Sequence, residues 1–539
     1  MTSSLRLDAR RPLGDPSRRQ LLRAGGAFSL GLAGCQSVAT SGPSSAPAIA
    51  TLGASKLGVG ELFTLGVASG DPVADGMVLW TRLAPDPLNP DPVLRDAVPV
   101  VWEVSEDATF GRVVRRGQTL ARPEWGHSVH VEPYGLAPGR PYYYRFIADG
   151  QVSPVGRTRT APVHLAPLDR LRFGFASCQH FEQGYFTAYR DALARDLDLF
   201  IHLGDYIYEG AWGPQVRRQA VIEAMDLSEY RRLHAQYKLD PDLQAAHAAM
   251  PWLMIWDDHE VVNDYADLND EDYLPVDAMR ARRAAAYQAY YEHMPVRVRS
   301  RPRGPDMHFH GASTWGDLAA FALTDARQYR TDHACQTPED GGGRVVTCDE
   351  LDAPSRTLLG SEQERWLNRG LGRSGATWEL LAQPTLFSRL FQTTRDGEPG
   401  AWSDGWDGYP RTRQRILDTV QGRGLSNFVS IGGDMHSWWQ ADLKADFDNP
   451  ESATIGTEFV TTSVTAHSYS YNTFNRMLPD NPHIGFMDTR ERGYAVAEIT
   501  PARMEVEFRE VESVYALESP TRIRKRYVVE SGRPGAVEA

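Results

Sequence analysis

Hydrophobic and polar residues alternate in short runs over residues 59–163. Valine, threonine, tyrosine and tryptophan fill these runs, and Asp-Pro, Pro-Gly and Asp-Gly dipeptides separate them. Short alternating runs between turn residues are typical of antiparallel strands in an all-β sandwich. The pattern therefore predicts a small β-sandwich domain over 59–163, with strands near 77–81, 100–104, 127–131 and 142–146.

The pattern changes after residue 166. Leu171, Phe173 and Phe175 alternate as in a strand, residues 186–193 repeat at helical spacing, and residues 197–203 form a second apolar run. A β-α-β succession of this kind indicates a parallel pair of strands. We therefore expect an α/β domain over 164–530, with further buried strands at 252–256 and 428–431 and a helix at 281–291.

The first residues are typical of an export signal. Arg18 and Arg19 precede a weakly apolar stretch, 24–33, that is too short and too rich in glycine to span a membrane. The pattern predicts a twin-arginine signal peptide over 1–34, and a basic N-terminal tail is the alternative. A signal of this type implies the twin-arginine export machinery as a partner and a periplasmic, extracellular or cell-surface location.

Cys35 ends the sequence Leu32-Ala33-Gly34-Cys35, which has the form of a lipobox. If it is one, Cys35 carries a lipid that anchors the protein to a membrane. The alternative is a chance match, with signal cleavage after Ala48. Residues 35–58 are rich in Ser, Ala, Gly and Pro and are expected to form a flexible tether.

The formal net charge of the chain is −13, and the six Arg and two Asp of residues 1–34 make the remainder more acidic still. This balance argues against binding to nucleic acid or to an anionic lipid surface. An acidic protein that acts on phosphate esters must therefore obtain local positive charge from metal ions and a few arginines.

Five short segments place Cys, Asp, Tyr or His directly after an apolar, strand-like run. In an open α/β sheet, ligands collect at the carboxyl ends of the strands. This layout predicts a multinuclear metal site for hydrolysis at phosphorus, where metals clamp the phosphoryl oxygens and hold the attacking hydroxide. The segments are 175–179, 201–209, 255–260, 323–330 and 431–436.

Asp205 is the expected bridging carboxylate, because Gly204 lets the backbone turn tightly enough for the Asp to face two metals. Tyr208 lies three residues later and reaches the same metal; as a tyrosinate it favours ferric iron. Cys178 is interpreted as a thiolate ligand of that metal. The alternative for Cys178 is an inert, buried small side chain.

Asp258 is a predicted ligand of the second metal, and His259 is better placed to donate a proton to the phosphoryl group or the leaving oxygen. Asp257 and Glu260 are expected only to hold the loop. Asn263 completes a calcium-like oxygen shell in this interpretation, with a turn residue as the alternative.

Asp434 and His436 alternate at a strand end, so their side chains point the same way and supply one ligand each to adjacent metals. His202, inside an apolar strand, is interpreted as a satisfied core histidine. The tryptophans either line a substrate cleft or pack in the core; they are Trp402, Trp406, Trp438 and Trp439.

Arg327 and Arg330 are candidate phosphate clamps, and a salt bridge with Asp325 is the alternative for them. The expected catalytic residues are thus His259, Asp205 and Arg327.

Four cysteines are present, and two of them, Cys335 and Cys348, flank a Gly-rich loop. In an oxidising compartment these two are well placed to form a disulfide, which would contribute about 3 kcal/mol by loop closure. Two free thiols are the alternative.

The motifs, taken in order, resemble those of the alkaline phosphatase D (PhoD) family over nearly the whole mature chain. The matching segments are 63–72, 78–83, 176–179, 202–209, 256–260 and 432–437. The resemblance implies a calcineurin-like, four-layer αββα metallophosphoesterase sandwich after a small all-β domain. Residues 136–144 of that domain resemble the corner of a fibronectin type III-like module. A lipobox is not general in the family.

The resemblance also implies Fe3+ together with Ca2+ and hydrolysis of phosphomonoesters and phosphodiesters. By similarity, iron is held by Cys178, Asp205, Tyr208 and His436, and calcium faces Asp205, Asp258, Asn263 and Asp434.

Two alternatives remain open at this point. One is a dedicated phosphodiesterase or phospholipase D-like enzyme that acts on lipid or cell-wall polymer. The other is a surface-binding protein in which the metal crevice is only structural. A short basic segment, 519–525, is interpreted as a possible helix over the crevice.

Overall fold

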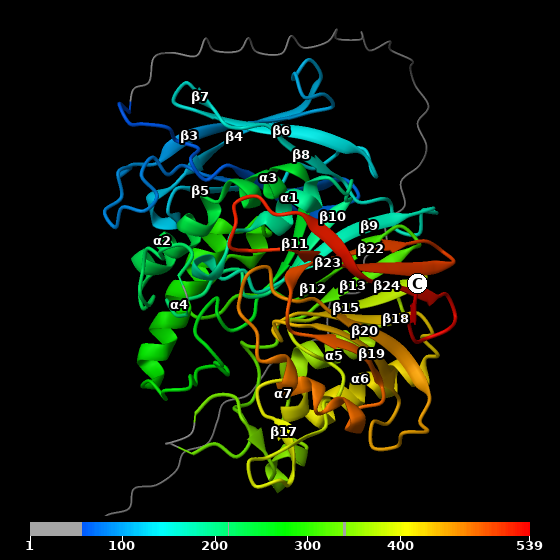
Figure 1. Cartoon of the computed structure of the whole chain (residues 1–539). Helices are drawn as coiled ribbons and strands as arrows, with labels where there is room; N and C mark the ends of the chain where they lie inside the picture. Colours follow the sequence, from blue (N-terminus) through cyan, green and yellow to red (C-terminus); the bar gives the residue numbers. More distant parts are fainter. Residues whose placement is uncertain (1–56, 214, 338–340) are drawn as a thin grey trace, which may run out of the picture. The chain divides into compact units, whose positions relative to one another are not determined.

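The computed structural model describes residues 57–213, 215–337 and 341–539 (Figure 1). The predicted signal peptide, the lipobox cysteine Cys35 and nearly all of the predicted tether lie outside these residues. Among the helices of the described part, none is long and apolar enough to cross a membrane.

Two large β-sheets form the centre of the fold. The ten-stranded sheet has the order β25-β24-β23-β22-β9-β10-β11-β1-β2-β5, and the seven-stranded sheet has the order β12-β13-β15-β18-β20-β19-β21. β9, β10 and β11 are parallel neighbours, as are β13, β15, β18 and β20. These seven parallel strands are β9 (Leu171–Ala176), β10 (Leu199–Leu203), β11 (Pro251–Ile255), β13 (Ala319–Leu323), β15 (Trp378–Ala382), β18 (Phe428–Gly432) and β20 (Thr454–Val460).

The core between the two sheets follows from the alternation of the strands. Phe173 and Phe175 of β9 and Ile201 of β10 pack in one buried cluster with Phe321 of β13 and Ile431 of β18. Every second residue of each strand therefore faces the opposite sheet, and the intervening residues face the helices.

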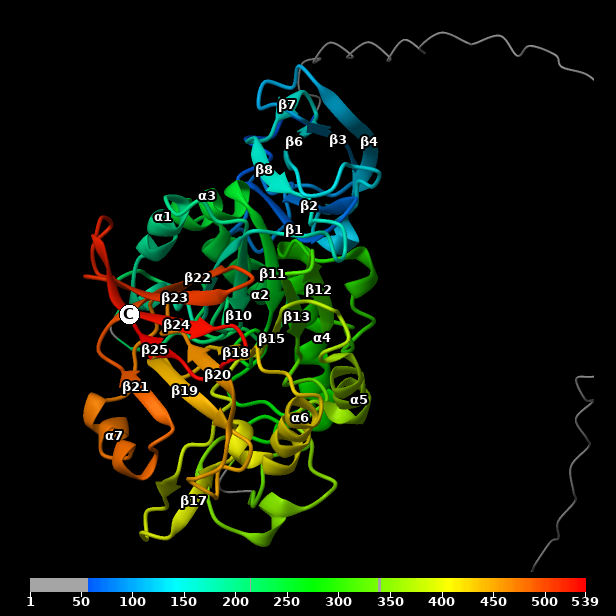
Figure 2. The same ribbon diagram turned by 90° about the vertical axis from the view of Figure 1, so that its right-hand side faces the viewer.

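Helices cover the two outer faces of this pair of sheets. Trp252 of β11 and Phe200 of β10 pack in one buried cluster with residues of α1 (Thr187–Leu193), α2 (Leu227–Lys238), α3 (Pro241–Ala249) and α4 (Val276–His293). A second outer cluster joins Leu381 of β15 to α5 (Gly360–Gly370) and α6 (Pro410–Gly422). The four layers are thus helix, sheet, sheet and helix, which confirms the predicted αββα fold (Figure 2).

The N-terminal part is all-β, but its strands are shared between two sheets. A five-stranded sheet contains β3 (Val98–Ser105), β4 (Val113–Ala121), β6 (Pro141–Ala148), β7 (Gln151–Val152) and β8 (Gly156–Arg159). The other strands extend the ten-stranded sheet, because β1 pairs in parallel with β11, with Ser69 opposite Pro251. These strands are β1 (Val67–Val73), β2 (Gly76–Arg82) and β5 (Ser128–Val131).

One local feature of the predicted fibronectin-like corner is present. The backbone N–H of Ala137 donates a hydrogen bond of 2.9 Å to the hydroxyl of Tyr142, which links the turn to β6. A tyrosine that bonds the backbone a few residues upstream is the feature known as a tyrosine corner.

The basic segment 519–525 does not form a helix. It enters β24 (Thr521–Glu530), which pairs antiparallel with β23 (Arg503–Val511). Tyr527 and Val529, two residues apart, both pack in the core, and buried residues at every second position are typical of a strand. The remaining elements are β12 (Gly311–Trp315), β14 (Val345–Val346), β16 (Gln392–Thr393), β17 (Pro399–Trp402), β19 (Trp438–Lys444), β21 (Ile484–Asp488), β22 (Arg492–Ile499), β25 (Val537–Glu538) and α7 (Tyr471–Asn475).

Candidate metal centre

The turn after β10 fixes the position of Asp205. Gly204 has a φ of +106°, and a Cβ at this position would lie 2.7 Å from the backbone nitrogen of Asp257, so only glycine fits. The carboxylate of Glu260 accepts hydrogen bonds from the backbone N–H groups of Asp205 (3.1 Å) and Tyr206 (2.6 Å). Glu260 also accepts from the N–H of Asp257 (2.8 Å), so it holds both loops together, as expected.

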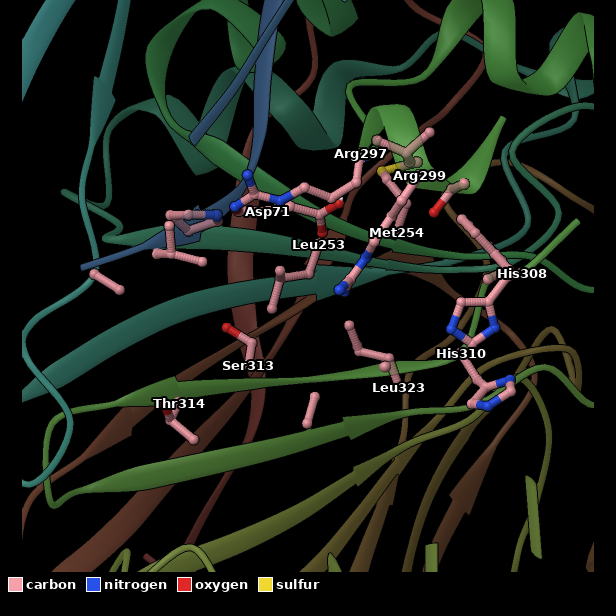
Figure 3. A pocket seen from close by; sticks show the side chains of 18 of the residues that line it. Asp71, Leu253, Met254, Arg297, Arg299, His308, His310, Ser313, Thr314 and Leu323 are labelled. Atoms are coloured by element: carbon pink, nitrogen blue, oxygen red, sulfur yellow. Dashed lines mark hydrogen bonds between the residues drawn. The ribbon is translucent and has the colours of Figure 1, made fainter. Parts of the chain in front are cut away.

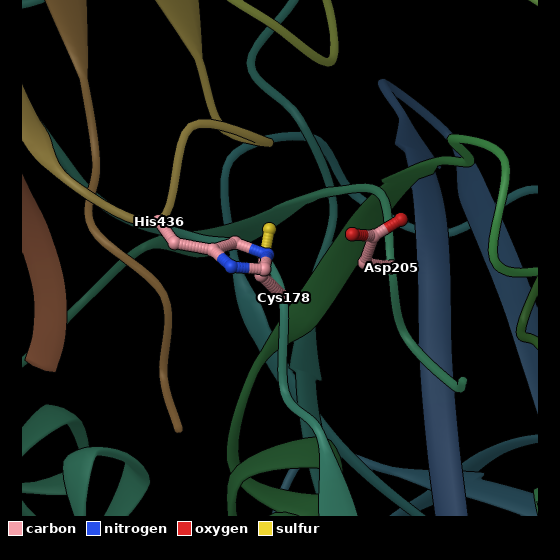
Figure 4. A group of neighbouring side chains, drawn as sticks. All are labelled: Cys178, Asp205 and His436. Carbon is pink, nitrogen blue, oxygen red and sulfur yellow. The ribbon is translucent and has the colours of Figure 1, made fainter. Parts of the chain in front are cut away.

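Cys178, Asp205 and His436 meet although they follow three different strands (Figure 4). Each offers a ligand atom, and these atoms lie within 4.8 Å of one another. The Tyr208 hydroxyl lies 3.0 Å from Asp205 Oδ2 and 3.0 Å from His436 Nε2. The structure therefore brings together the four residues that the sequence assigned to iron.

The tautomer of His436 can be read from its surroundings. Its Nδ1 lies 2.6 Å from the backbone carbonyl oxygen of His467, which can only accept a hydrogen bond. Nδ1 is therefore protonated, and burial, the main cause, lowers the pKa of His436 to about 3, so the ring is neutral. Its Nε2 keeps a free lone pair toward Tyr208 and Asp205. A histidine whose second nitrogen is held by a carbonyl is the usual form of a metal ligand.

Asp205 supplies the observation that best tests whether a cation fits here. Its side chain is buried, and Oδ1 has no hydrogen-bond partner among the residues that the structure describes. Burial, together with the neighbouring Asp258 and Asp257 carboxylates, raises the pKa of Asp205 well above its ordinary value. Burial and then Asp205 also raise the pKa of the Cys178 thiol. A bound cation would offset the charge of these buried acids and would provide a partner for the Asp205 oxygen, so the site is suited to a cation.

Asp258 and His259 lie beside Asp205, with ligand atoms again within 4.8 Å of one another. His259 Nδ1 is 2.7 Å from Glu209 Oε2, so Nδ1–H donates to this carboxylate and leaves Nε2 as the free nitrogen. Burial acts to lower the pKa of His259, but the carboxylates of Glu209, Asp258 and Asp205 together raise it well above its ordinary value. This raised pKa favours the protonated ring, which would donate from Nε2.

A third group extends the cluster with residues that the sequence did not single out. Asp264 and Asp404 meet Asp258, with carboxylate oxygens within 4.8 Å. Burial, followed by the charges of Asp404 and Asp258, raises the pKa of Asp264 to about 7. The predicted calcium residue Asn263 directs its amide nitrogen to Glu271 (3.0 Å), so its neighbour Asp264 is the residue that joins the acids.

Asp434 approaches from the second sheet, at the end of β18. Its Oδ2 accepts a hydrogen bond from the Thr385 hydroxyl. Burial and the negative charge of Asp258 raise the pKa of Asp434 to about 7. Asp434 thus lies within electrostatic reach of the centre.

Arg327 is engaged by acids on both sides. Nε donates to Asp257 Oδ1 at 2.5 Å, and the two terminal nitrogens donate to Asp404 at 2.7 and 2.9 Å. The side chain is only 2% exposed, and one terminal nitrogen lies 3.7 Å from Asp258. A guanidinium held in this way orients the acidic loops, so the expectation that Arg327 clamps phosphate is revised to a positioning role.

Arg330 is likewise bound inside the protein, since it donates to Asp404 and to the Tyr409 hydroxyl (3.1 Å). The alternative partner proposed for both arginines, Asp325, instead accepts from Trp256 Nε1 (2.9 Å) and from the backbone N–H of Arg327. Asp325 therefore closes a turn and forms no salt bridge with either arginine.

Five of the site residues have left-handed backbone conformations. The φ angles are 59° at Cys178, 55° at Asp205, 54° at Asp264, 61° at Asp434 and 49° at His436. Such angles are uncommon outside glycine, and strained residues of this kind concentrate at functional sites. Asp and His adopt this conformation more often than most non-glycine residues, but their presence in the sequence does not by itself mark a left-handed position.

Comparison with known proteins identifies the family. The sequence model described as PhoD-like phosphatase matches residues 173–508, and the one described as PhoD-like phosphatase, N-terminal domain, matches residues 51–162. The chain belongs to the PhoD-like phosphatase family. It is 44% identical over 507 residues to alkaline phosphatase D of Bacillus subtilis (strain 168), a match that covers 91% of this chain and 84% of the relative.

A solved structure of PhoD matches with a TM-score of 0.85 and 44% identity, covering 89% of this chain and 92% of that chain. The predicted family and fold class are thereby confirmed, and this PhoD-like phosphatase is a phosphoric ester hydrolase. The N-terminal family match ends at residue 162, next to the predicted boundary at 163.

Trp212 forms an aromatic wall beside the candidate centre of this PhoD-like phosphatase. Its ring centroid lies 5.6 Å from Tyr208, 5.3 Å from His259 and 5.0 Å from His180, and the side chain is 41% exposed. A Cβ at Gly210 would lie 2.4 Å from Trp212 Cζ3, so glycine permits this ring position. Trp212 is thus a partly exposed aromatic residue beside the candidate centre, which the sequence did not single out.

The tryptophans singled out from the sequence mostly pack in the core. Trp406, Trp438 and Trp439 are fully buried, so the packing alternative holds for them. Trp402 is half-buried at the end of β17 and contacts Gly343. His202 is buried as expected, but neither ring nitrogen has a hydrogen-bond partner in the described part of the chain.

Cys335 and Cys348 are joined in a disulfide, with their Cα atoms 6.6 Å apart, which confirms the predicted bond. Within the segment that they close, the Gly343 N–H donates a 2.6 Å hydrogen bond to Asp264 Oδ2. The disulfide therefore supports one edge of the acidic group.

We expect the double variant Cys335→Ala/Cys348→Ala to be less stable by up to about 3 kcal/mol, because the unfolded chain gains the freedom of an open loop. Thermal unfolding of the two oxidised proteins measures the difference. Addition of a reductant should lower the melting temperature of the wild type but leave that of the double variant unchanged. Equal melting temperatures for the two oxidised proteins would contradict the expectation.

Proposed function

We propose that the clustered side chains form the catalytic centre of this phosphoric ester hydrolase and that they hold Fe3+ and Ca2+. Iron is assigned to Cys178, Asp205, Tyr208 and His436. Calcium is assigned to the acidic side, with Asp205, Asp258, Asn263 and Asp434 from the sequence and with Asp264 and Asp404 from the geometry. The observation that carries the proposal is the buried Asp205 Oδ1, which has no hydrogen-bond partner among the described residues and belongs to a carboxylate that lies with a thiol, a phenol and an imidazole.

The donor set distinguishes the two sides of the proposed centre. A thiolate, a tyrosinate and an imidazole suit a transition metal, whereas carboxylate oxygens alone suit a hard cation such as Ca2+. When bound, such ions activate water and offset the charge that develops on the phosphoryl oxygens.

The protein's own groups have separable roles in the proposed reaction. Protonated His259 donates a proton from Nε2 to the leaving-group oxygen, and Glu209 holds the ring in place through Nδ1–H. Glu260 holds the Asp205 and Asp257 loops in register. Arg327 keeps Asp257 and Asp404 aligned and offsets part of their negative charge. Hydrolysis of a monoester by this route yields an alcohol and phosphate.

The natural substrate class is proposed to include phosphomonoesters and phosphodiesters. The half-exposed Trp212 beside His259 favours substrates with a flat or apolar leaving group. A dedicated diesterase that acts on lipid or cell-wall polymer is the second candidate. Export by the twin-arginine machinery to the periplasm or cell surface belongs to the same proposal, with Cys35 as a lipid anchor if it is modified.

We expect Trp212→Ala to lower kcat/KM for nitrophenyl phosphate by about two- to tenfold, because an aromatic contact is worth about 0.5–1.5 kcal/mol. Hydrolysis of glycerol phosphate, which has no ring, should change much less. Gly210→Ala should act in the same direction, since the new Cβ displaces the Trp212 ring.

A matched control is Trp366→Ala, which removes a partly buried tryptophan that packs against the α5–α6 cluster. This variant should keep the wild-type ratio of the two kcat/KM values. If Trp212→Ala also keeps the wild-type ratio of the two kcat/KM values, the Trp212 ring does not contact the substrate.

The proposed function is tested by assaying the metal-loaded protein with nitrophenyl phosphate and with bis-nitrophenyl phosphate. We expect hydrolysis of both, loss of activity in a chelator, and recovery when iron and calcium are restored together. Comparison of kcat/KM for the two esters separates a phosphatase from a dedicated diesterase. Full activity in the presence of a strong chelator would contradict the metal-dependent proposal.

A further inference from the structure

A separate cavity of about 210 Å3 lies away from the candidate metal centre, and none of its lining residues belongs to that centre. Its walls come from the end of β1, from β11 and the segment that contains Val298–Ser300, and from residues 308–314, which lead into β12 (Figure 3). β12 is the edge strand of the seven-stranded sheet. An edge strand has backbone N–H groups that are not used in pairing.

Two arginines line this cavity, and their surroundings differ. Arg297 is engaged, because it donates to Glu132 and the Tyr134 hydroxyl, each at 3.1 Å, and to the backbone carbonyl of Asp71. Arg299 is exposed and forms no hydrogen bond or ion pair with the described part of the chain. In Figure 3 the Arg297 side chain runs toward Asp71, whereas Arg299 points into the open space.

Polar side chains also line the same space. Ser313 and His310 are among them, but the Ser313 hydroxyl and the His310 Nδ1 are themselves shielded from solvent and do not face the cavity. His308 stands next to His310, with ring centroids 4.6 Å apart, and is exposed. The exposed His308 and His164 imidazoles are therefore the accessible ring donors of this cavity.

The balance of charge in the cavity favours an anion. Asp71 is the one acid among the lining residues, and its Oδ2 accepts from the backbone N–H of Arg297 (3.2 Å). Arg299 therefore supplies a positive charge that acts on Asp71 but is not held by a hydrogen bond or ion pair in the described part of the chain, and three imidazoles line the same cavity, from His164, His308 and His310. In a chain with a net charge of −13, such a local excess of donors and positive charge is selective for an anion.

We propose that this cavity is a second anion-binding site, which takes a small phosphate: inorganic phosphate or the phosphate group of a small monoester. Pockets for drug-sized ligands enclose about 300–1,000 Å3, so this cavity suits a smaller ligand. The planar guanidinium of Arg299 binds two oxygens of a tetrahedral oxyanion, and the exposed imidazoles of His164 and His308 donate to the others.

Equilibrium dialysis of the metal-loaded full chain against labelled inorganic phosphate tests the proposal. Arg299→Gln should bind one phosphate fewer per chain than the wild type, and its hydrolytic activity in phosphate-free buffer should be unchanged. His308→Asn should weaken the same binding event by about tenfold, which provides a second test if Arg299→Gln does not fold. The matched control is Arg303→Gln, an exposed arginine four residues away that does not line the cavity.

A second experiment with the Asp205→Asn variant shows whether the site binds free phosphate or a monoester. This variant is used because it is not expected to hydrolyse glycerol phosphate. Competition of glycerol phosphate with labelled phosphate at the Arg299-dependent site would identify a monoester site, and the absence of competition would identify a site for the free ion. The proposal is overturned if Arg299→Gln and the wild type bind equal numbers of phosphate ions. Phosphate binding and hydrolytic activity are measured separately. The number of phosphate ions bound per chain therefore tests this proposal even if the protein does not hydrolyse phosphate esters.

Discussion

Asp205→Asn should reduce kcat by at least about a thousandfold and should release metal ions from the centre. The change keeps the size of the side chain but removes the negative charge of the residue shared by the Cys178–His436 and Asp258–His259 groups. Asp205 Oδ1 is buried and has no hydrogen-bond partner in the part of the chain that the structure describes, so an amide at this position adds N–H donors where a cation is expected. The loss corresponds to about 4 kcal/mol of transition-state stabilisation.

The measurement combines a kinetic assay with nitrophenyl phosphate and a count of metal ions per chain. Asp196→Asn is the matched control, because Asp196 also has a left-handed backbone (φ 51°) but lies on the surface. The control should retain wild-type activity and metal content. An Asp205→Asn protein that keeps more than a tenth of the activity with its full complement of metals would refute the bridging role.

Cys178→Ala should lose iron but retain calcium. The thiol is buried, its ligand atom lies within 4.8 Å of those of Asp205 and His436, and it does not belong to the group of Asp258, Asp264 and Asp404. Removal of a group that only supports a ligand costs about 10–100-fold in metal affinity, so removal of the ligand itself should cost more. Activity should fall in parallel with the iron content.

Ser177→Ala is the matched control for this variant, because the Ser177 hydroxyl accepts a 3.2 Å hydrogen bond from the Cys178 thiol but is not an assigned ligand. It should retain iron. If Cys178→Ala binds as much iron as the wild type, Cys178 is not an iron ligand. It is then an inert, buried small side chain.

The parallel strands of the core could be predicted from the sequence because they carry a clear signal, whereas the four-layer αββα arrangement was implied by the family resemblance. Phe173 and Phe175 alternate, and the fully apolar run around Ile201 indicates a parallel strand buried on both faces. Candidate ligands at the ends of such strands then converge by topology alone, which explains why Cys178, Asp205 and His436 meet. Strand periodicity thus indicated that these residues meet, and the family resemblance implied their assignment to iron.

Other features depend on contacts that periodicity does not encode. Asp404 follows the short strand β17 and reaches the acidic group through the long loops of the fold. The partners of Arg327 lie at Asp257 and Asp404, 70 and 77 positions away along the chain, whereas the sequence suggested its near neighbour Asp325. The long-range pairing of β1 with β11 was missed for the same reason.

Elemental analysis of the mature protein, purified after native export, tests the central claim most directly. The arrangement of Cys178, Tyr208 and His436 around Asp205, next to a group of carboxylates, predicts iron together with calcium in each chain. Zinc or manganese without iron would contradict the ligand roles of Cys178 and Tyr208 and would favour a generic two-metal phosphoesterase.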